Sequence, residues 1–403
     1  MPYSVRRRVA VTGLGAICAV GSDVPAVWSA LQAGRSGIGP IAGIPTDRLL
    51  AGVAAEIAGF DGAAHFDSRR LPLLDRSAQL ALVAAREAVQ QAGLTPDPAQ
   101  AARRGAIMAA AIGQSSLDAG YLALYGERAS RVHPLTVPRV MPNAPASHLS
   151  IEFGLRGPCY AVASACASGN HAIALAADTI RAGRADVILA GGADASVVVG
   201  VVKSWEALRV LSADTCRPFS RDRTGLVLGE GAAVLVLEDW DHAQRRGAVI
   251  LAEVAGSGMS ADAADITAPD AEGAAAAMQA ALDDAGLHAS EIGYVNAHGT
   301  GTRLNDRIES AALRRVFKRP PPVSSSKSMI GHCLSAGGAL EAVATVMALR
   351  DGVLPPTAGF READPECDVD CVPNLSRAVP VEAALSNSFA FGGLNAVLAF
   401  RAA

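Results

Sequence analysis

The sequence predicts an α/β protein made of two similar halves. Short apolar runs rich in β-branched residues alternate with longer stretches of helical periodicity, the pattern of buried strands packed against helices. The same order of strand, helix and strand occurs a second time further along the chain. Half of the 403 residues are apolar while only 4 % are aromatic, so we expect a dense core built from small side chains.

The repeated order is visible in the predicted elements. In the first half these are a strand over residues 9–12, a helix over 76–92 that ends at Gly93, and a strand over 106–112. In the second half they are a strand over 249–254, a helix over 272–285 that ends at Gly286, and a strand over 292–297. Both helix ends read Ala-Gly-Leu, at 92–94 and at 285–287. These matches indicate an internal duplication.

We expect the halves to divide near residue 250, after the polar segment 241–247. The N-terminal half would then comprise residues 1–250 and the C-terminal half residues 251–403. Residues 114–156, rich in Pro, His and Arg, look like an insertion in the first half. Such an insertion would cover an active site or build a dimer contact.

Bulk composition argues against several classes of function. The formal net charge of −4 and the pI near 6.1 do not suit nucleic acid, which requires a basic excess. No uncharged apolar run reaches the roughly 18 residues that span a membrane, and Gly13 and Gly15 interrupt the apolar run near the N-terminus. Seven scattered cysteines fit a reducing compartment better than a disulfide framework, so a cytoplasmic location is expected.

Two motifs that could suggest a cofactor or a metal are incomplete. Gly13-Leu-Gly15 follows a strand, but a dinucleotide loop needs a third glycine at position 18, where Cys18 stands. Cys367 and Cys371 lack the second pair of ligands that a zinc site requires. We therefore expect neither a nicotinamide cofactor nor a metal ion.

Cys166 is the strongest candidate for a nucleophile. Residues 157–177 read as a short strand, a tight turn of small residues and a helix, with Cys166 at the helix start. The unpaired amides and the positive end of a helix favour the thiolate and lower the pKa of a thiol by about a unit or more. The alternative, a buried structural cysteine, stays open from this pattern alone.

Two histidines lie in loops rich in glycine and hydroxyl residues. His298 belongs to the segment Asn296-Ala-His-Gly-Thr-Gly-Thr302, and His332 ends the segment Ser324-Ser-Ser-Lys-Ser-Met-Ile-Gly-His332. Both loops follow apolar runs, and active-site residues are commonly mounted at strand ends. A lone histidine is more often structural, but two of them with a helix-mounted cysteine indicate acyl transfer.

Four blocks of the sequence together resemble the elongating β-ketoacyl-acyl-carrier-protein synthases. They are the blocks around Cys166, His298 and His332, and the C-terminal segment Ser386-Asn-Ser-Phe-Ala-Phe-Gly-Gly-Leu-Asn395. Their order and approximate spacing are those of the family, and the resemblance spans essentially the whole chain. Residues 204–211 and 216–225 look more like the nodulation-type members and the reducing type II polyketide synthases. The resemblance implies the thiolase fold, a duplicated five-layered αβαβα arrangement with the site between the halves.

The resemblance also implies an acyltransferase that performs a decarboxylative Claisen condensation. The Cys166 thiolate would take an acyl chain from the phosphopantetheine arm of an acyl carrier protein, and the backbone amides of Cys166 and Phe391 would hold the oxyanion. His298 and His332 would stabilise the enolate that forms when malonyl-acyl-carrier protein loses its carboxylate. The product would be a β-ketoacyl thioester two carbons longer. No cofactor is implied beyond the carrier's arm.

Further functional residues of the family match positions in this chain. Lys327 matches a supporting lysine whose acidic partners are Glu309 and Glu341. Asp306 matches the same network, although Asp306 and Glu309 would alternatively form a helix capping box. The remaining matches are Thr300 and Thr302 at the pantetheine arm, Phe391 as a gating aromatic, and Ile112 and Trp205 in the acyl pocket.

The partners implied by the resemblance are an acyl carrier protein and a second chain of the same fold. The protein would form a homodimer, or it would be the active half of a heterodimer with a chain-length-factor-like subunit. A thiolase is a less favoured alternative, because thiolases use a second cysteine near the C-terminus. Carrier proteins are acidic, so the docking surface should be basic. The candidate docking residues are Arg69, Arg70, Arg128 and Arg131.

Overall fold

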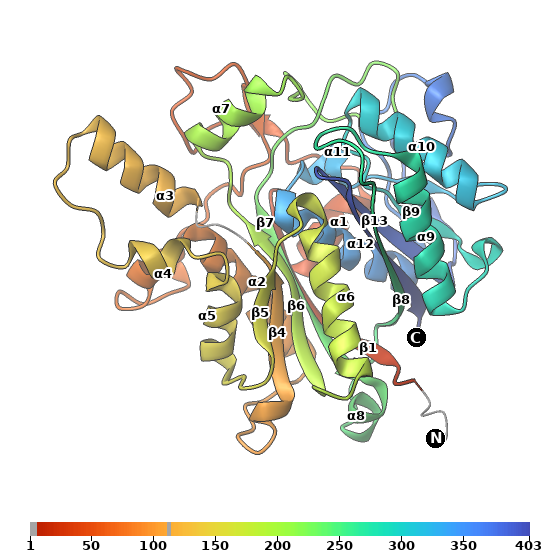
Figure 1. Ribbon diagram of the computed structural model, residues 1–403, viewed down its shortest axis with the longest axis horizontal. Coiled ribbons are helices and arrows are strands. Elements are labelled where there is room, and N and C mark those ends of the chain that lie inside the picture. Colours follow the sequence, from red (N-terminus) through yellow and green to blue (C-terminus); the bar gives the residue numbers. More distant parts are fainter. Residues whose placement is uncertain (1–5, 111–113) are drawn as a thin grey trace.

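The computed structural model describes residues 6–110 and 114–403, in which the strands form one large mixed sheet and two small pairs (Figure 1). The strands of the first half are β1 (Val9–Cys18), β4 (Arg104–Ala109), β5 (Cys159–Val162), β6 (Val187–Asp194) and β7 (Gly231–Asp239). Those of the second half are β8 (Ala252–Ala261), β9 (Tyr294–Asn296), β10 (Val323–Ser324), β13 (Ala383–Ala390) and β14 (Leu394–Ala402). The small pairs are β2 (Gly39–Pro40) with β3 (Val53–Ala54) and β11 (Val353–Leu354) with β12 (Arg377–Ala378).

Helices alternate with these strands along the chain. Those of the first half are α1 (Val24–Gln32), α2 (Arg76–Gln91), α3 (Gln114–Tyr121), α4 (Thr136–Val140), α5 (Ala144–Phe153), α6 (Ser168–Arg181), α7 (Val199–Ala207) and α8 (Trp240–Arg245). Those of the second half are α9 (Ala271–Ala285), α10 (Arg303–Val316), α11 (Lys327–Ile330) and α12 (Gly337–Asp351). Two short 3₁₀ turns, η5 (Ala165–Ala167) and η7 (Leu334–Ala336), lead directly into α6 and α12.

The large sheet, ten-stranded over the described residues, consists of two halves with the same topology. The first half has the order β5-β4-β6-β7-β1, in which β4 is parallel to β5 and β6 while β7 is antiparallel to both of its neighbours. The second half, β10-β9-β13-β14-β8, repeats this order and these directions. The halves join where β1 pairs with β8. This repeat confirms the duplication that the sequence predicts.

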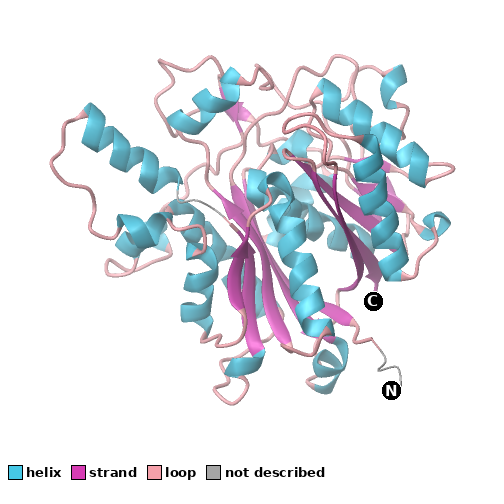
Figure 2. Ribbon diagram, in the orientation of Figure 1, coloured by secondary structure: helices cyan, strands magenta, loops and turns pink. Residues whose placement is uncertain are grey.

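Helices cover both halves of the sheet and separate them, as Figure 2 shows. The central layer consists of α6, which packs on β4 and β6, and α12, which packs on β13 and β7; the two helices also contact each other. On the outer faces, α2 and α5 cover the first half, while α9 covers the second and packs against α10. The resulting order of layers is the αβαβα arrangement expected of the thiolase fold.

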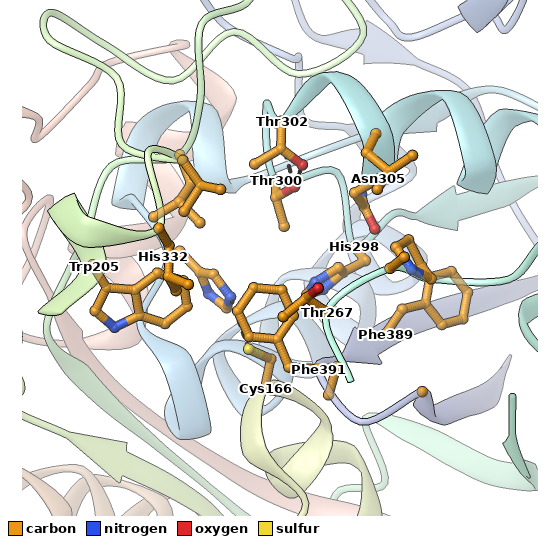
Figure 3. A pocket seen from close by; sticks show the side chains of 18 residues that line it. Cys166, Trp205, Thr267, His298, Thr300, Thr302, Asn305, His332, Phe389 and Phe391 are labelled. Carbon is orange, nitrogen blue, oxygen red and sulfur yellow. Dashed lines mark hydrogen bonds between the residues drawn. The ribbon is translucent and has the colours of Figure 1, made fainter. Parts of the chain in front are cut away.

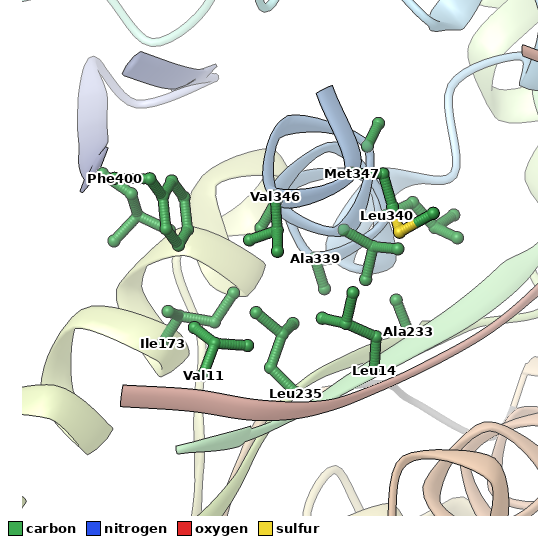
Figure 4. Close-up of a cluster of buried hydrophobic side chains, with 14 of the residues drawn as sticks. Val11, Leu14, Ile173, Ala233, Leu235, Ala339, Leu340, Val346, Met347 and Phe400 are labelled. Carbon is green, nitrogen blue, oxygen red and sulfur yellow. The ribbon is translucent and has the colours of Figure 1, made fainter. Parts of the chain in front are cut away.

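The main hydrophobic core lies between the two halves of the sheet and around α12. Every residue of α12 from Gly337 to Leu349 is buried, which is why this helix has no polar face. Figure 4 shows Leu340 and Val346 of α12 above Leu14 and Leu235 of the first half. The helix is therefore held from both halves, and the position of its N-terminal end is fixed by the core.

The Gly13-Leu-Gly15 motif has a packing role. The two glycines lie in β1 beneath α2, and a Cβ atom added at Gly13 or Gly15 would lie 2.1 Å from the Ala88 carbonyl oxygen or 1.8 Å from the Ala84 carbonyl oxygen. Only glycine permits this approach of helix to strand.

The predicted elements exist, but several of their bounds differ. β1 continues to Cys18, because its pairing with β7 extends to Cys18. All ten of its residues, glycines included, are buried. The second-half strand begins at Ala252 rather than 249 and extends to Ala261, since Val249 lies in an exposed connection after α8. The strand predicted over 106–112 spans Arg104–Ala109, and residues 111–113 lie outside the described part of the chain.

The predicted insertion at 114–156 contains α3, α4 and α5. α5 packs on α2 and on the edge of the sheet, whereas α3 projects away from the layered body at the left of Figure 1. Tyr121, Leu122 and Tyr125 are exposed on this projection. Among the described residues, no helix combines the length and the apolar character required to cross a bilayer.

Candidate active site

The sulfur of Cys166 lies where the first residues of α6 meet the segment that leads into α12. Cys166 is the middle residue of η5, and Ala165 before it has φ +47°, a left-handed conformation that costs a non-glycine residue about 1 kcal/mol or more. The Ser168 hydroxyl holds this turn, since it donates to the Ala165 carbonyl at 2.7 Å and accepts from the Ser164 amide at 2.8 Å. The turn therefore places the thiol at the helix start, as the sequence predicts.

Glycines bring the two central helices into close contact beside this thiol. A Cβ atom added at Gly169 would lie 2.7 Å from the Ala339 amide nitrogen, and one added at Gly338 would lie 2.6 Å from the Asn170 side-chain oxygen. Both positions therefore require glycine. This contact brings Cys166 of the first half and His332 of the second within reach of each other.

His332 lies beside the thiol. Its Nε2 atom is 3.2 Å from the Cys166 sulfur. The backbone of His332 is held by two hydrogen bonds, one from its amide to the Val227 carbonyl at 2.7 Å and one from the Gly229 amide to its carbonyl at 3.0 Å. The imidazole is thus mounted on an anchored segment.

His298 approaches the same point from the end of β9. Its ring centroid is 5.5 Å from that of His332, in an edge-to-face arrangement. Lys327 donates to His298 Nδ1 at 3.3 Å and to the His298 carbonyl at 2.6 Å. Because an ammonium group can only donate, Nδ1 accepts and the ring proton is placed on Nε2. Figure 3 shows both imidazoles close to the Cys166 sulfur, in a cavity of about 260 Å³.

Two buried carboxylates hold Lys327 and the backbone of His298 in place. Lys327 forms a fully buried ion pair with Glu341. Glu309 accepts from the amides of His298 and Gly299 at 2.8 and 2.7 Å, and from the Asn387 side chain at 3.2 Å. The Glu309 carboxylate therefore fixes the backbone that carries the His298 ring.

Asp306 lies inside α10 and binds a neighbouring loop. Its carboxylate accepts from the amides of Phe219 and Gly301, at 2.8 and 3.2 Å, and Arg223 lies 3.5 Å away. The helix begins at Arg303, and its N-cap residue makes no side-chain cap. The capping-box alternative is therefore wrong, because Asp306 lies a full turn inside the helix.

Burial determines the protonation of the central groups. It lowers the pKa of both His298 and His332 well below the usual range, with Lys327 adding to the effect, so both imidazoles are neutral near pH 7. Burial also raises the pKa of the Cys166 thiol to about 11; the Lys327 charge opposes this shift and the Asp194 charge adds to it. This direction is opposite to the lowered thiol pKa expected from the sequence, because the loss of water on burial is the largest of these effects.

The remaining predicted residues surround the thiol, with one exception. Thr300 and Thr302 line the cavity, and their hydroxyl oxygens are 2.8 Å apart. Phe391 stacks on Trp205 with 5.6 Å between ring centroids, and both rings border the Cys166 cavity and a second one of about 230 Å³. Ile112 lies outside the described residues.

Several cavity residues were not singled out from the sequence, and three of them lie close to the catalytic groups. Phe389 lies edge-on to His298 with 6.1 Å between ring centroids, and Asn305 lines the same cavity. Asp194, buried at the end of β6, borders the second cavity beside Cys166. The sequence does offer a signal for Asp194. A carboxylate at the end of an apolar strand is a candidate functional residue, because burying a charge is costly.

The site lies between the halves of a duplicated αβαβα fold and contains a cysteine at a helix start, two neutral histidines and a buried lysine. This combination is that of a condensing enzyme that works by acyl transfer. The chain belongs to the β-ketoacyl synthase family. Its residues 6–243 match the family's "Beta-ketoacyl synthase, N-terminal domain" and residues 251–361 match its "Beta-ketoacyl synthase, C-terminal domain".

Curated relatives extend over the whole chain. Nodulation protein E of Rhizobium sp. (strain N33) is 52% identical over 399 residues, which cover 98% of this chain and 99% of the relative. The 3-oxoacyl-[acyl-carrier-protein] synthase 2 of Staphylococcus aureus (strain COL) is 39% identical over 409 residues, which cover 99% of each chain. The protein is thus a type II ketosynthase, and the nodulation-type resemblance is confirmed.

Solved structures share the fold. The ishigamide ketosynthase/chain length factor has a TM-score of 0.94 and 37% identity, covering 99% of this chain and 100% of that one. The type II polyketide synthase complex AntDE:AntF, an acyl-carrier protein with its ketosynthase, has a TM-score of 0.89 and 30% identity, with the same coverage. These matches confirm the predicted thiolase-type fold.

Proposed function

We propose that the chain condenses an acyl group carried on Cys166 with malonyl-acyl-carrier protein, with loss of carbon dioxide. The observation that carries the proposal is the placement of His332 Nε2 at 3.2 Å from the Cys166 sulfur, with His298 in the same cavity. The carrier's phosphopantetheine arm supplies both thioesters. Relatives that act on acyl carrier protein, or are bound to one, support this choice of substrate.

The first step transfers the acyl group. His332 is close enough to accept the Cys166 proton as the sulfur attacks the carrier's thioester carbon. The backbone amides of Cys166 and Phe391 serve as donors to the oxyanion of the tetrahedral intermediate. Collapse of that intermediate releases the carrier thiol, which takes up the proton held by His332. The products are acyl-Cys166 and free carrier.

The second step forms the carbon–carbon bond. The malonyl thioester loses carbon dioxide, and the electron pair of the broken bond passes to the enolate. His298, whose Nε2 carries the ring proton, donates to the enolate oxygen, and His332 donates there in the tautomer that carries its single ring proton on Nε2. The enolate carbon attacks the carbonyl carbon of acyl-Cys166, and the cysteine leaves as a thiolate that takes up a proton from solvent water. The carrier then holds a β-ketoacyl chain two carbons longer.

The two cavities at Cys166 serve two parts of the substrate. The one lined by Thr300 and Thr302 receives the pantetheine arm, since its hydroxyl pair offers hydrogen bonds to amide groups. The one beyond Trp205 and Phe391 receives the acyl chain. Phe391 borders both cavities and is 37% exposed at the turn between β13 and β14, a position from which it acts as the gate.

The carrier protein docks at the rim of the first cavity. Leu208 and Leu304 line that cavity and are partly exposed, and the exposed Arg209 and Arg303 are their chain neighbours. The arginines named from the sequence do not line the cavity, and Arg70 is paired with Glu152. We therefore place the basic contact at Arg209 and Arg303.

The protein acts in the cytoplasm as a dimer. β5 forms one end of the large sheet and its residue Tyr160 is exposed, as are Tyr121, Leu122 and Tyr125 of the same half. An open sheet edge with apolar surface favours pairing with a second chain of this fold. Both a homodimer and a heterodimer with a chain-length-factor-like subunit fit, and the ishigamide ketosynthase/chain length factor supports the second form.

Mass spectrometry of Cys166 tests the proposal. Incubation with acyl-carrier protein should add the acyl mass to Cys166, and malonyl-carrier protein should then remove it with formation of β-ketoacyl-carrier protein. Cys166→Ala should lose both steps, whereas the matched control Cys159→Ala, which removes an exposed thiol, should retain them. Condensation that persists in Cys166→Ala would refute the proposed function.

A further inference from the structure

Asp194 is a buried carboxylate that the mechanism above does not use. It is the last residue of β6 and only 6% exposed. Its oxygens accept hydrogen bonds from the Ser335 hydroxyl at 2.8 Å, from the Ser335 amide at 3.3 Å and from the Ser196 hydroxyl. Burial raises the pKa of Asp194, whereas the hydrogen bonds that Ser196 and Ser335 donate oppose this shift and favour the ionised carboxylate.

The partner of Asp194 lies in the segment that joins His332 to α12. Ser335 belongs to the 3₁₀ turn η7, three residues after His332. Leu334, between them, has φ +44°, a strained conformation that persists only where neighbouring contacts hold it. The two hydrogen bonds from Ser335 to Asp194 provide such contacts.

His332 is thereby held by two sets of contacts. At His332 itself, the amide donates to the Val227 carbonyl and the carbonyl accepts from the Gly229 amide. On its C-terminal side, the hydrogen bonds of Ser335 tie the turn to the end of β6, in the other half of the molecule. Loss of the second tie would let η7 relax and would move the imidazole relative to the Cys166 sulfur.

Asp194 also places a negative charge beside the thiol. Asp194, Cys166 and Ser335 border the same cavity. The other charged or titratable groups around Cys166 are His298, His332, Lys327 and Glu341. A negative charge close to a thiol disfavours its ionisation, so Asp194 opposes Lys327 in its effect on Cys166.

We propose that Asp194 is a positioning residue for the condensation, which holds the His332 turn through Ser335 and places a negative charge in the cavity that Cys166 borders. This inference rests on the proposed roles of Cys166 and His332. It differs from them in predicting separate effects for the carboxylate's hydrogen bonds and for its charge.

The variants Asp194→Asn and Asp194→Ala separate the two effects. Asp194→Asn keeps an oxygen that accepts from Ser335 but removes the charge, so the pH profile of Cys166 alkylation should move down by about one unit. Condensation by this variant should be largely retained. Asp194→Ala removes both the acceptor oxygens and the negative charge. It should lower kcat for condensation by about 10- to 100-fold with little change in KM for the carrier.

Two serine variants give a matched comparison. Ser335→Ala removes a bond to the His332 turn, whereas Ser196→Ala removes a bond to the same carboxylate from a different loop. Condensation should fall more in Ser335→Ala. Circular dichroism and thermal unfolding check each fold, and Ser335→Ala tests the contact with the His332 turn if Asp194→Ala does not fold.

The outcomes distinguish this inference from the proposed function. If the wild-type protein fails to acylate Cys166, the proposed function is wrong. If wild-type loading and condensation occur, but the alkylation profile of Asp194→Asn and the kcat of Asp194→Ala both match the wild type, Asp194 has no positioning role. Equal losses in Ser335→Ala and Ser196→Ala would also contradict the role of the His332 turn.

Discussion

At the scale of single residues, one ammonium group and several carboxylates surround a thiol and two imidazoles in a site with little access to water. Lys327 is the positive charge nearest to the histidines, and it donates to His298 while paired with Glu341. The lysine therefore has two effects: it selects the His298 tautomer that presents Nε2–H to the cavity, and it neutralises a buried carboxylate.

Replacement of Lys327 by Met should damage both stability and activity. The Glu341 carboxylate would be left buried without its partner, at a cost of about 3–5 kcal/mol in the free energy of unfolding. Condensation should fall by about 100-fold because the His298 tautomer is no longer fixed. Urea unfolding and steady-state kinetics measure the two effects.

Two further variants identify the cause. The double variant Lys327→Met with Glu341→Leu should recover much of the stability, since no unpaired charge remains, but it should not recover activity. Lys203→Met, which removes an exposed lysine paired with Glu206, should change neither quantity appreciably. Full activity in Lys327→Met would contradict the tautomer argument.

The pH profile of the Cys166 thiol is a second prediction at this scale. Because burial raises the pKa of Cys166 to about 11, alkylation by iodoacetamide should be slow at pH 7 and should rise steadily with pH in the free protein. The measurement requires a Cys159→Ala background, since the Cys159 thiol is exposed. A plateau already reached below pH 8 would show instead that the helix end dominates.

At the scale of secondary-structure elements, the site depends on two helices that begin side by side. The internal repeat places α6 and α12 at equivalent positions in their halves, so their N-terminal ends meet between the two halves of the large sheet. Cys166 precedes one helix and His332 precedes the other. Their reactive atoms can approach to 3.2 Å only because glycines line the helix contact.

Gly169→Ala should therefore impair catalysis without touching a reacting group. The new methyl group would lie 2.7 Å from the Ala339 amide nitrogen, so the helices must separate, at a cost of about 1–3 kcal/mol. Both the melting temperature and kcat for condensation should fall. The matched control is Gly120→Ala in α3, where a Cβ meets nothing within 4 Å; unchanged kcat in Gly169→Ala would contradict this account.

The sequence predicts well those features that depend only on residues close together along the chain. Strands such as β1 and helices such as α2 follow from runs of apolar residues, and Cys166, His298 and His332 stand in short motifs that can be read directly. The pairing of Asp194 with Ser335 joins residues 141 apart, so no local pattern reveals it. The raised pKa of Cys166 could not be predicted from the sequence for the same reason, because the segments that bury its thiol come from both halves of the chain.

At the scale of the whole molecule, the net charge of −4 must be reconciled with an acidic partner. Only a local basic surface can attract a carrier protein, and Arg209 and Arg303 lie beside residues that line the cavity rim. Charge reversal at both positions should raise KM for carrier-bound substrates roughly tenfold. A small N-acetylcysteamine thioester should react as before, since it needs no docking surface.

Arg69→Glu provides the contrast, because Arg69 is exposed but does not line the cavity. Its KM for the carrier should match the wild type. The opposite result, with Arg69→Glu impaired and the Arg209 and Arg303 variant normal, would place the docking surface near the start of α2.

Stability of the whole fold should depend on pH through the two active-site histidines. Burial lowers the pKa of His298 and His332 well below that of an unfolded chain, near 6.5. Below that pH the unfolded chain binds protons that the folded protein cannot, so these residues contribute stability above pH 6.5 that is lost on acidification. Each histidine should account for about 1.4 kcal/mol per pH unit in that range.

Urea unfolding at pH 5.5 and pH 7.5 tests this dependence. The loss of stability on acidification should be smaller in His332→Asn by about 1 kcal/mol, because the variant has one fewer buried imidazole to protonate on unfolding. His133→Asn, which replaces an exposed histidine, should keep the wild-type dependence. If His332→Asn also keeps it, the His332 imidazole is already charged in the folded protein, and a charged imidazole could not take the Cys166 proton in the first step.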